Sequence, residues 1–172
     1  LNLKKIIPAT YSIVKLVFKL FAILFQFTQK FIDYMKQRTP VSTIMTRDVI
    51  TLNLNDNMEL AEKIFESRKI RHIPIVNGKM VVGMLSHTDL MRISFSDLNQ
   101  EENEINSVVY DLFTIEQIMA KSIISVTSDT TIKEVAQILA EHEFHAVPVV
   151  DNGALVGIVT STDLIKFLLE QF

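Results

Sequence analysis

The sequence predicts a mixed αβ fold of the α+β class, in which two β-α-β-β-α units pack with pseudo-twofold symmetry behind an amphipathic N-terminal helix. Three observations predict it. The chain repeats itself at a fixed offset, each repeat alternates strand-like and helix-like patterns, and residues 1–34 differ in composition from the rest. We therefore divide the chain into an N-terminal helix with its lead-in (1–40), a first unit (41–93), an acidic spacer (94–114) and a second unit (115–172).

Composition excludes several function classes. The chain has 172 residues and a net charge of -3, which gives no electrostatic case for a nucleic-acid partner. It has no Trp and only three Tyr, so a platform that stacks single-stranded bases is not expected. It has no Cys, which excludes disulfides, thiolate metal sites and thiol catalysis, and makes the reducing cytoplasm the default compartment.

The N-terminal segment is basic and apolar. It holds five lysines and no acidic residue before Asp33, and residues 11–32 are rich in Phe, Leu, Ile and Val. On a helix, one narrow stripe of small or polar side chains would run along an otherwise apolar surface, since they recur at alternating steps of three and four: Ser12, Lys15, Lys19, Ala22, Gln26, Gln29 and Asp33.

Four interpretations of this segment compete. A transmembrane span needs about 20 mainly apolar residues, and Lys15 and Lys19 interrupt such a window. A secretory signal needs an unbroken apolar core and a small-residue cleavage site, and neither is visible. A helix that contacts a membrane surface or a partner protein through residues 6–32 fits the basic stripe better. The fourth interpretation is that residues 1–34 are upstream sequence or part of a larger protein, because the sequence starts with Leu and Met35 comes later.

An internal repeat organises the rest of the chain. A shift of 74 residues places Asp89 on Asp163, Pro74 on Pro148 and Val82-Gly83 on Val156-Gly157 without a gap. A unit of about 60 residues is marginal as a lone domain, so the two units should pack on each other. The polar, acidic stretch between them, 94–107, is expected to be an exposed spacer.

Each unit shows the same order of elements. A short strand is followed by a helix, two strands joined by a tight Gly turn, and a second helix: 49–52, 58–65, 70–76, 80–85 and 87–93 in the first unit, and 123–126, 132–139, 144–150, 154–159 and 161–169 in the second. Asp56 with Glu59, and Thr131 with Glu134, have the spacing of a capping box. Pro74 and Pro148 lack an N–H, so their strands should lie at an edge or lose pairing there.

Candidate site residues lie where the last strand of each unit meets the last helix. The stretches GMLSHTDL (83–90) and GIVTSTDL (157–164) both place a Ser or Thr three residues before an Asp. This spacing is a helix-capping signal, since the hydroxyl and carboxylate bond to first-turn N–H groups. The same groups suit a nucleotide, because a hydroxyl can donate to a phosphate and a carboxylate can accept from two ribose hydroxyls.

The repeated unit resembles the CBS domain, and the tandem pair resembles a Bateman module over 41–172. The stretches that carry the resemblance are IMTRDVITL, IRHIPIV and GMLSHTDLM, then IMAKSIISV, FHAVPVV and GIVTSTDLI. The layout is also similar to short bacterial stand-alone CBS-pair proteins. The resemblance implies sheets that pack together with helices on their outer faces, and adenosine-containing ligands in the clefts between the units: AMP, ADP, ATP, S-adenosylmethionine or a dinucleotide.

The resemblance also implies roles for particular residues. Asp89 and Asp163 match the ribose-binding acid, and Ser86 and Thr160 match the phosphate-binding hydroxyl. Residues just before the Pro match positions that meet phosphate or base: Arg71, His72 and His145. The wall against the base is matched by backbone around Ile50, Thr51, Leu52, Ile124, Ser125 and Val126. Two departures are Leu54 and Ser128, where the family often has Pro, and Ala146, which stands where the first unit has His72.

The expected function is a regulatory, non-catalytic, energy-sensing module that binds an adenine nucleotide or adenosyl ligand and works as a homodimer. No cofactor is expected, and Mg²⁺ only together with a nucleotide. No metal site is expected either, because the four His residues lack a third ligand at zinc spacing. The rival is a scaffold that dimerises and docks a partner without a ligand. Nucleotide turnover that depends on Asp89 or Asp163 is the enzymatic alternative.

Overall fold

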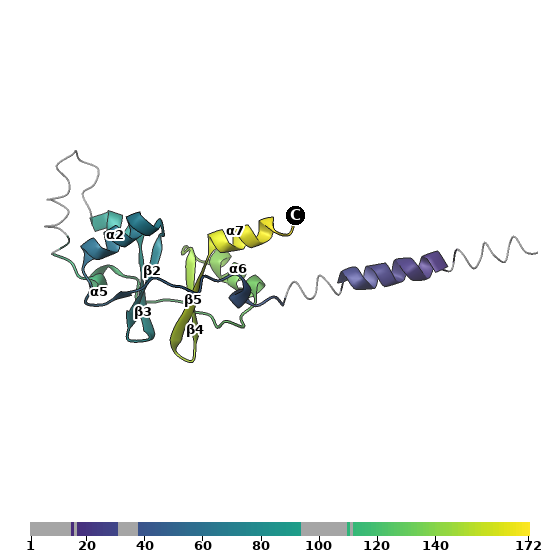
Figure 1. Cartoon of the computed structure of the whole chain (residues 1–172), viewed down its shortest axis with the longest axis horizontal. Coiled ribbons are helices and arrows are strands. Elements are labelled where there is room, and N and C mark those ends of the chain that lie inside the picture. Colours follow the sequence, from purple (N-terminus) through teal and green to yellow (C-terminus); the bar gives the residue numbers. More distant parts are fainter. Residues whose placement is uncertain (1–14, 16, 31–37, 94–109, 111) are drawn as a thin grey trace, which may run out of the picture. The chain divides into compact units, whose positions relative to one another are not determined.

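The computed structural model describes residues 15, 17–30, 38–93, 110 and 112–172. The chain divides into two units, Leu1–Thr39 and Pro40–Phe172. Within the first unit, residues 17–30 form a helix, as the sequence predicts (Figure 1). Among the described residues, no helix is long and apolar enough to cross a membrane. The predicted spacer falls mostly on 94–109 and 111, which lie outside the described residues.

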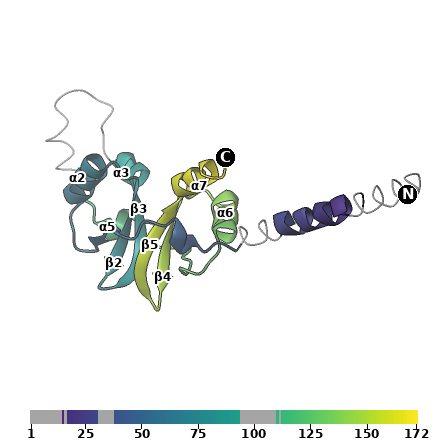
Figure 2. The ribbon, with the colours of Figure 1, turned by 45° about the vertical axis from the view of Figure 1, so that its right-hand side comes forward.

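The second unit contains both repeats and is a mixed αβ structure. Figure 2 shows two β-hairpins side by side, with α2, α3, α6 and α7 gathered at one end of them. The elements in chain order are η1 (Val41–Thr43), β1 (Leu52–Asn53), α2 (Met58–Arg68), β2 (His72–Asn77), β3 (Met80–Ser86), α3 (His87–Ile93), α5 (Ile115–Ile118), α6 (Ile132–Glu141), β4 (Ala146–Asp151), β5 (Ala154–Thr160) and α7 (Ser161–Leu169).

The two hairpins follow the predicted strands closely, whereas the first strand of each repeat is much shorter than predicted. β1 covers only Leu52–Asn53, which pairs in parallel with β2, and the second repeat has a single equivalent bridge between Val126 and Val149. The predicted strands over 49–52 and 123–126 were therefore wrong for most of their length. The apolar residues that precede these pairs serve another purpose, since Val49 and Ile123 pack between the repeats against Met84, Ala146 and Ile158.

Pro74 lies in a central strand, because β2 is paired on both sides. It is opposite Met84 of β3, whose N–H and C=O both bond to Ala120 instead, at 3.0 and 2.9 Å. Pro74 and Met84 therefore form a non-hydrogen-bonded pair, and the Pro74 nitrogen points away from β3, toward β1. The pairing of β1 with β2 begins only at Ile75, one residue after Pro74. The missing N–H removes no ladder bond. Neither predicted outcome holds for Pro74, which stays paired in a central strand, whereas Pro148 lies in an edge strand as predicted, since β4 pairs only with β5 in its sheet.

The first helix of each repeat buries its predicted apolar face, but the two helices start differently. Thr131 and Glu134 form the predicted capping box of α6. In the first repeat the predicted pair of Asp56 and Glu59 was wrong. Asn57 caps α2 by accepting from the Leu60 N–H, and the Asp56 carboxylate instead accepts from the Asn53 N–H at 2.7 Å. The Asp56 carboxylate therefore closes the turn before the helix.

The segment that leads into each repeat packs on the other repeat. Val41 and Met45 belong to the core of the second repeat, and Tyr110, Ile115 and Met119 belong to the core of the first. Thr46 exchanges two hydrogen bonds of 2.9 Å with Ile158, and Ala120 makes the equivalent exchange with Met84. These reciprocal contacts relate the repeats by pseudo-twofold symmetry and join them into one body.

Candidate functional site

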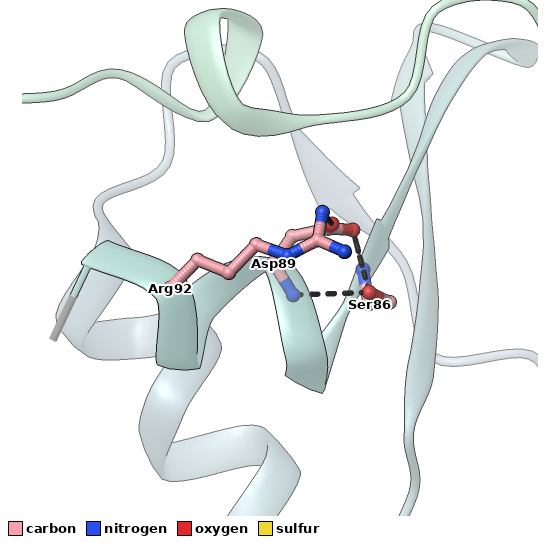
Figure 3. Close-up of polar contacts among 3 residues, drawn as sticks. All are labelled: Ser86, Asp89 and Arg92. Atoms are coloured by element: carbon pink, nitrogen blue, oxygen red, sulfur yellow. Dashed lines mark hydrogen bonds and ion pairs between the residues drawn. The ribbon is translucent and has the colours of Figure 1, made fainter.

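The first acidic corner lies where β3 ends at Ser86 and α3 begins at His87. The Asp89 carboxylate accepts from the Ser86 N–H at 3.1 Å and from the Ser86 hydroxyl at 2.5 Å, both through Oδ2. The Asp89 N–H donates back to the Ser86 hydroxyl at 3.1 Å. Figure 3 shows the Arg92 guanidinium beside the carboxylate, where its Nη1 lies 3.3 Å from Oδ1. Both oxygens of Asp89 therefore have partners within the chain.

The second corner, between β5 and α7, repeats this geometry with one difference. The Asp163 Oδ2 accepts from the Thr160 N–H at 2.8 Å and from its hydroxyl at 2.7 Å, and the Asp163 N–H donates to that hydroxyl. Lys166 stands where Arg92 does in the first repeat, and none of the described residues pairs with the Asp163 Oδ1. The capping interpretation is correct at both corners, yet at Asp163 it uses only one carboxylate oxygen and leaves the other free to accept.

Two cavities lie between the repeats, one at each corner. The first, about 660 Å³, brings the Ser86 and Asp89 corner against the second repeat, and the second, about 620 Å³, brings the Thr160 and Asp163 corner against the first. The first cavity is lined by Arg71, His72, Met84, Ser86, Thr88, Asp89, Arg92, Ala120, Ser122, Ile123, Ile124, His142, Glu143, Phe144, His145, Ala146 and Pro148. The second is lined by Thr46, Asp48, Val49, Ile50, Lys69, Ile70, Arg71, His72, His145, Ile158, Thr160, Ser161, Thr162, Asp163 and Lys166.

Three basic side chains border both cavities: Arg71, His72 and His145. Burial lowers the pKa of His72 below 6.5, helped by the nearby His145 and Arg71, while Asp89 acts in the opposite direction. The neutral form of His72 is therefore favoured in the free protein. An anionic group placed beside it would favour the protonated ring and raise its pKa.

The two cavities differ in charge and in aromatic character. Glu143 and Phe144 line the first cavity where Lys69 and Ile70 line the second. The His142 and Phe144 rings are stacked with centroids 5.0 Å apart, so the first cavity has an aromatic wall. Lys166 of the second cavity has its counterpart in Arg92 of the first, so Lys69 is the additional cation that makes the second cavity the more basic of the two.

The structure brings most predicted site residues together. Nine of them line at least one cavity: Ser86, Asp89, Thr160, Asp163, Ile50, Ile124, Arg71, His72 and His145. The other four, Thr51, Leu52, Ser125 and Val126, line neither cavity. Leu52 and Val126 are buried in the two cores because their backbones pair with β2 and β4. Their side chains therefore belong to the cores of the two repeats and not to the cavity walls.

Several lining residues escaped sequence reasoning. Thr46 and Asp48 face the Asp163 corner, and Ala120 and Ser122 face the Asp89 corner, because each lead-in crosses to the other repeat. No local motif marks these residues. The repeat offset was the available signal, since it pairs Thr46 with Ala120 and Asp48 with Ser122. Among the described residues, no group of three or more His, Asp or Glu side chains is placed to hold a metal ion.

Comparisons with known proteins identify a family and several relatives of this chain. The CBS domain family matches residues 41–96 and 115–170. Protein MJ1225 of Methanocaldococcus jannaschii is 32% identical over 130 residues, which cover 75% of this chain and 42% of that protein. A second relative from that organism, MJ1404, is 30% identical over 136 residues, and the match covers 32% of its length. The chain thus spans less than half of the length of these two curated relatives.

Two solved structures share the fold. The CBS domain pair of protein MJ0100, in complex with 5′-methylthioadenosine and S-adenosyl-L-methionine, is 28% identical with a TM-score of 0.64, over 78% of this chain and 98% of that one. CBSX2 in complex with AMP is 22% identical with a TM-score of 0.64, over 77% and 98% of the two chains. At that identity the second likeness shows the fold alone. With two family matches that coincide with the two structural repeats, the chain belongs to the CBS domain family and carries a tandem CBS pair.

Proposed function

We propose that the chain is a non-catalytic regulatory module that binds adenosine-containing ligands, AMP, ADP, ATP or an S-adenosylmethionine-like compound, in the two cavities between its CBS repeats. The observation that carries the proposal is the Asp163 corner. Its Oδ2 holds the helix cap, its Oδ1 accepts nothing among the described residues, and it borders a cavity of about 620 Å³. That volume is in the range of about 300–1,000 Å³ typical of small-ligand sites.

A carboxylate with one fixed oxygen and one free oxygen suits a ribose. The cap holds Asp163 in one rotamer, so little side-chain entropy is lost when the free oxygen accepts from a sugar hydroxyl. The Thr160 hydroxyl already donates to the carboxylate, and in the proposed complex it turns toward the ligand phosphate. The MJ0100 pair, whose complex contains two adenosyl compounds, supports this ligand class at 28% identity.

The differences between the cavities support different preferences. Lys69 of the second cavity stands where Glu143 stands in the first, whereas Lys166 and Arg92 are equivalents. The second cavity therefore has one more Lys or Arg than the first, which favours the ligand with more phosphate. Phe144, together with Ile123 and Ile124, gives the first cavity an apolar and aromatic wall suited to the adenine ring. In the first cavity a ribose must share Asp89 with Arg92, whose side chain is 75% exposed and can move aside.

Regulation follows from the position of the cavities. Each is lined by residues of both repeats, so a bound ligand contacts both repeats at once. A ligand that binds one packing of the two repeats more tightly than another therefore increases the population of the first packing. The size of this shift is set by the difference between the ligand's affinities for the two packings. In this way the occupancy of the cavities would report the cellular level of the ligand, which is the energy-sensing role.

We further propose that the module acts in the cytoplasm as a homodimer. Exposed apolar side chains on α7 support the dimer: Ile165, Leu168 and Leu169 are 58, 56 and 67% exposed. Met91 of α3 adds a fourth, 42% exposed. An apolar helix surface of this kind is typical of a protein contact. The N-terminal helix remains available for a membrane surface or a partner protein.

A thermal-shift panel tests ligand binding. A ligand at 100 times its Kd stabilises the native state by about 2.7 kcal/mol, or about 5–10 °C at this chain length. The panel includes AMP, ATP, S-adenosylmethionine, NAD and a cyclic dinucleotide, with Asp89→Asn and Asp163→Asn as test variants. Asp129→Asn is the matched control, since Asp129 is exposed and lines neither cavity.

The panel separates the sensor from its rival. We expect at least one adenosyl compound to raise the melting temperature of the wild type and the control, with a smaller shift in one or both test variants. If no compound shifts the wild type, a scaffold that dimerises without a ligand is the better account. An undiminished shift in a variant that carries both Asp89→Asn and Asp163→Asn would remove these two residues from the site.

A further inference from the structure

The N-terminal helix exposes an unusually large apolar surface. Over residues 17–30, eight large apolar side chains are each more than half exposed: Val17, Phe18, Leu20, Phe21, Ile23, Leu24, Phe25 and Phe27. Four of them are Phe, within fourteen residues of helix. A continuous surface of this kind marks a contact with a membrane or a protein rather than with water.

The arrangement of these side chains narrows the choice of partner. At 100° per residue, the eight apolar positions span roughly 220° of the helix circumference. A two-stranded coiled coil needs only a narrow a/d seam and would leave much of this surface in water. A helix that lies in a lipid interface sinks a broad apolar face about 5–10 Å into the acyl boundary. The width therefore favours lipid over a second copy of the same helix.

One polar side chain on the apolar face is already satisfied within the helix. Thr28 lies within the apolar face of the helix, and its hydroxyl donates to the Phe25 carbonyl at 2.8 Å. A hydroxyl transferred to an apolar medium without a partner costs several kcal/mol. Because this bond is made inside the helix, Thr28 does not oppose insertion of the face.

The charges indicate the kind of lipid. Lys15, Lys19 and Lys30 are exposed and share the narrow polar arc with Gln26 and Gln29. Residues 1–32 hold five lysines and no acid, in a chain whose net charge is -3. The N-terminal segment thus has a positive charge of its own beside its broad apolar face. Amines on the polar arc of a helix that inserts its apolar face lie at the depth of the headgroups, where they attract anionic lipid.

From these observations we infer that the helix over 17–30 is an anchor for an anionic lipid surface. Its Phe-rich face inserts among the acyl chains, and Lys15, Lys19 and Lys30 contact headgroup phosphates. The anchor would hold the CBS pair at the membrane surface. The inference does not depend on nucleotide binding, because the residues that carry it lie in the first unit, outside both cavities.

Vesicle flotation of the full chain tests the anchor. Vesicles of phosphatidylcholine alone are compared with vesicles that contain 30% phosphatidylglycerol, without any nucleotide, and floating fractions exclude aggregated protein. One variant replaces Lys15, Lys19 and Lys30 by Gln. Its matched control replaces three exposed lysines of the CBS pair, Lys63, Lys79 and Lys133, by Gln as well.

A second variant tests the apolar face. It replaces Phe18, Phe21 and Phe25 by Gln, with Met80→Gln as a control, since Met80 is a 59% exposed apolar residue of the β2–β3 hairpin. Circular dichroism of each variant verifies that the CBS pair remains folded.

We expect the wild type and both controls to float with anionic vesicles. The triple Gln variant of the lysines should bind about 100-fold more weakly, and the Phe variant should not float. The inference is overturned if the wild type fails to float, if neutral vesicles bind it equally well, or if the lysine variant floats like its control. A Phe variant that loses self-association while the wild type binds no vesicles would assign the face to a second copy of the chain.

Discussion

Substituting Gly157 by Ala tests the contact that joins the two repeats. Gly157 lies in β5 opposite Val149, and a Cβ built on it would lie 2.5 Å from Sδ of Met45 and 3.1 Å from the Thr46 carbonyl oxygen. Both neighbours come from the segment that leads into the first repeat. Gly157 is therefore required because a crossing segment of the other repeat lies against the strand.

The magnitude follows from how little the neighbours can move. The Thr46 backbone is fixed to Ile158 by two hydrogen bonds of 2.9 Å, and Met45 is 92% buried in the core of the second repeat. Inserting a methyl group into such packing costs about 1–3 kcal/mol. We expect Gly157→Ala to lower the free energy of unfolding by about 2 kcal/mol and the melting temperature by about 4–8 °C. Urea unfolding and a thermal scan measure the two quantities.

A double-mutant cycle shows whether Met45 is the cause. Met45→Ala alone should destabilise by creating a cavity, but it removes the side chain that the new methyl group meets. The penalty of Gly157→Ala should therefore shrink by at least about 0.5 kcal/mol in the Met45→Ala background. Gly153→Ala is the control, because its Cβ would meet no atom within 4 Å and its cost comes from a φ of +80°. Equal penalties of Gly157→Ala in both backgrounds would refute the crossing contact.

Three further predictions concern the site and its support. First, affinity for AMP should rise as the pH falls from 8 to 6, because the phosphate stabilises the protonated form of His72, whereas affinity for uncharged 5′-methylthioadenosine should not. Calorimetric titration with both ligands measures the affinities at each pH. The role of His72 would be contradicted if the affinity for AMP depended on pH in a His72→Asn variant as it does in the wild type. Second, the pKa of His72 lies below 6.5, so the native state loses stability as the pH falls from 6.5 through that lowered pKa. Urea midpoints between pH 8 and 5 should therefore fall less in His72→Asn than in the wild type. Third, Thr131→Ala removes the hydroxyl that caps α6 and should cost about 1 kcal/mol in urea unfolding, while an unchanged midpoint would count against that cap.

Sequence reasoning captured the parts of the fold that depend on local chemistry. The bounds of α3 and α7 were predicted to the residue, because an apolar strand, a hydroxyl and an Asp three residues later specify a capped helix start. The Asn152-Gly153 turn adopts positive φ at both residues, as the predicted hairpin requires. The 74-residue offset then predicted that the same corner occurs twice.

What could not be predicted depends on contacts between distant segments. The stretches 49–52 and 123–126 look like strands in isolation, but the crossing lead-ins leave only Leu52, Asn53 and Val126 in reach of a partner strand. Likewise, Gly157 does not have a positive φ, so no turn rule explains it. The close approach of Met45 is the reason for the glycine. These features follow from the packing of one repeat against the other, which the local pattern does not contain.

Isothermal titration calorimetry of the full chain with AMP and with S-adenosylmethionine tests the central claim most directly, beside an Asp89→Asn/Asp163→Asn double variant of confirmed fold. Saturable binding of at least one compound is the predicted result, with at most two molecules per chain and an affinity at least tenfold weaker in the double variant. The absence of binding heat for both compounds, or the same affinity in the double variant, would contradict the claim.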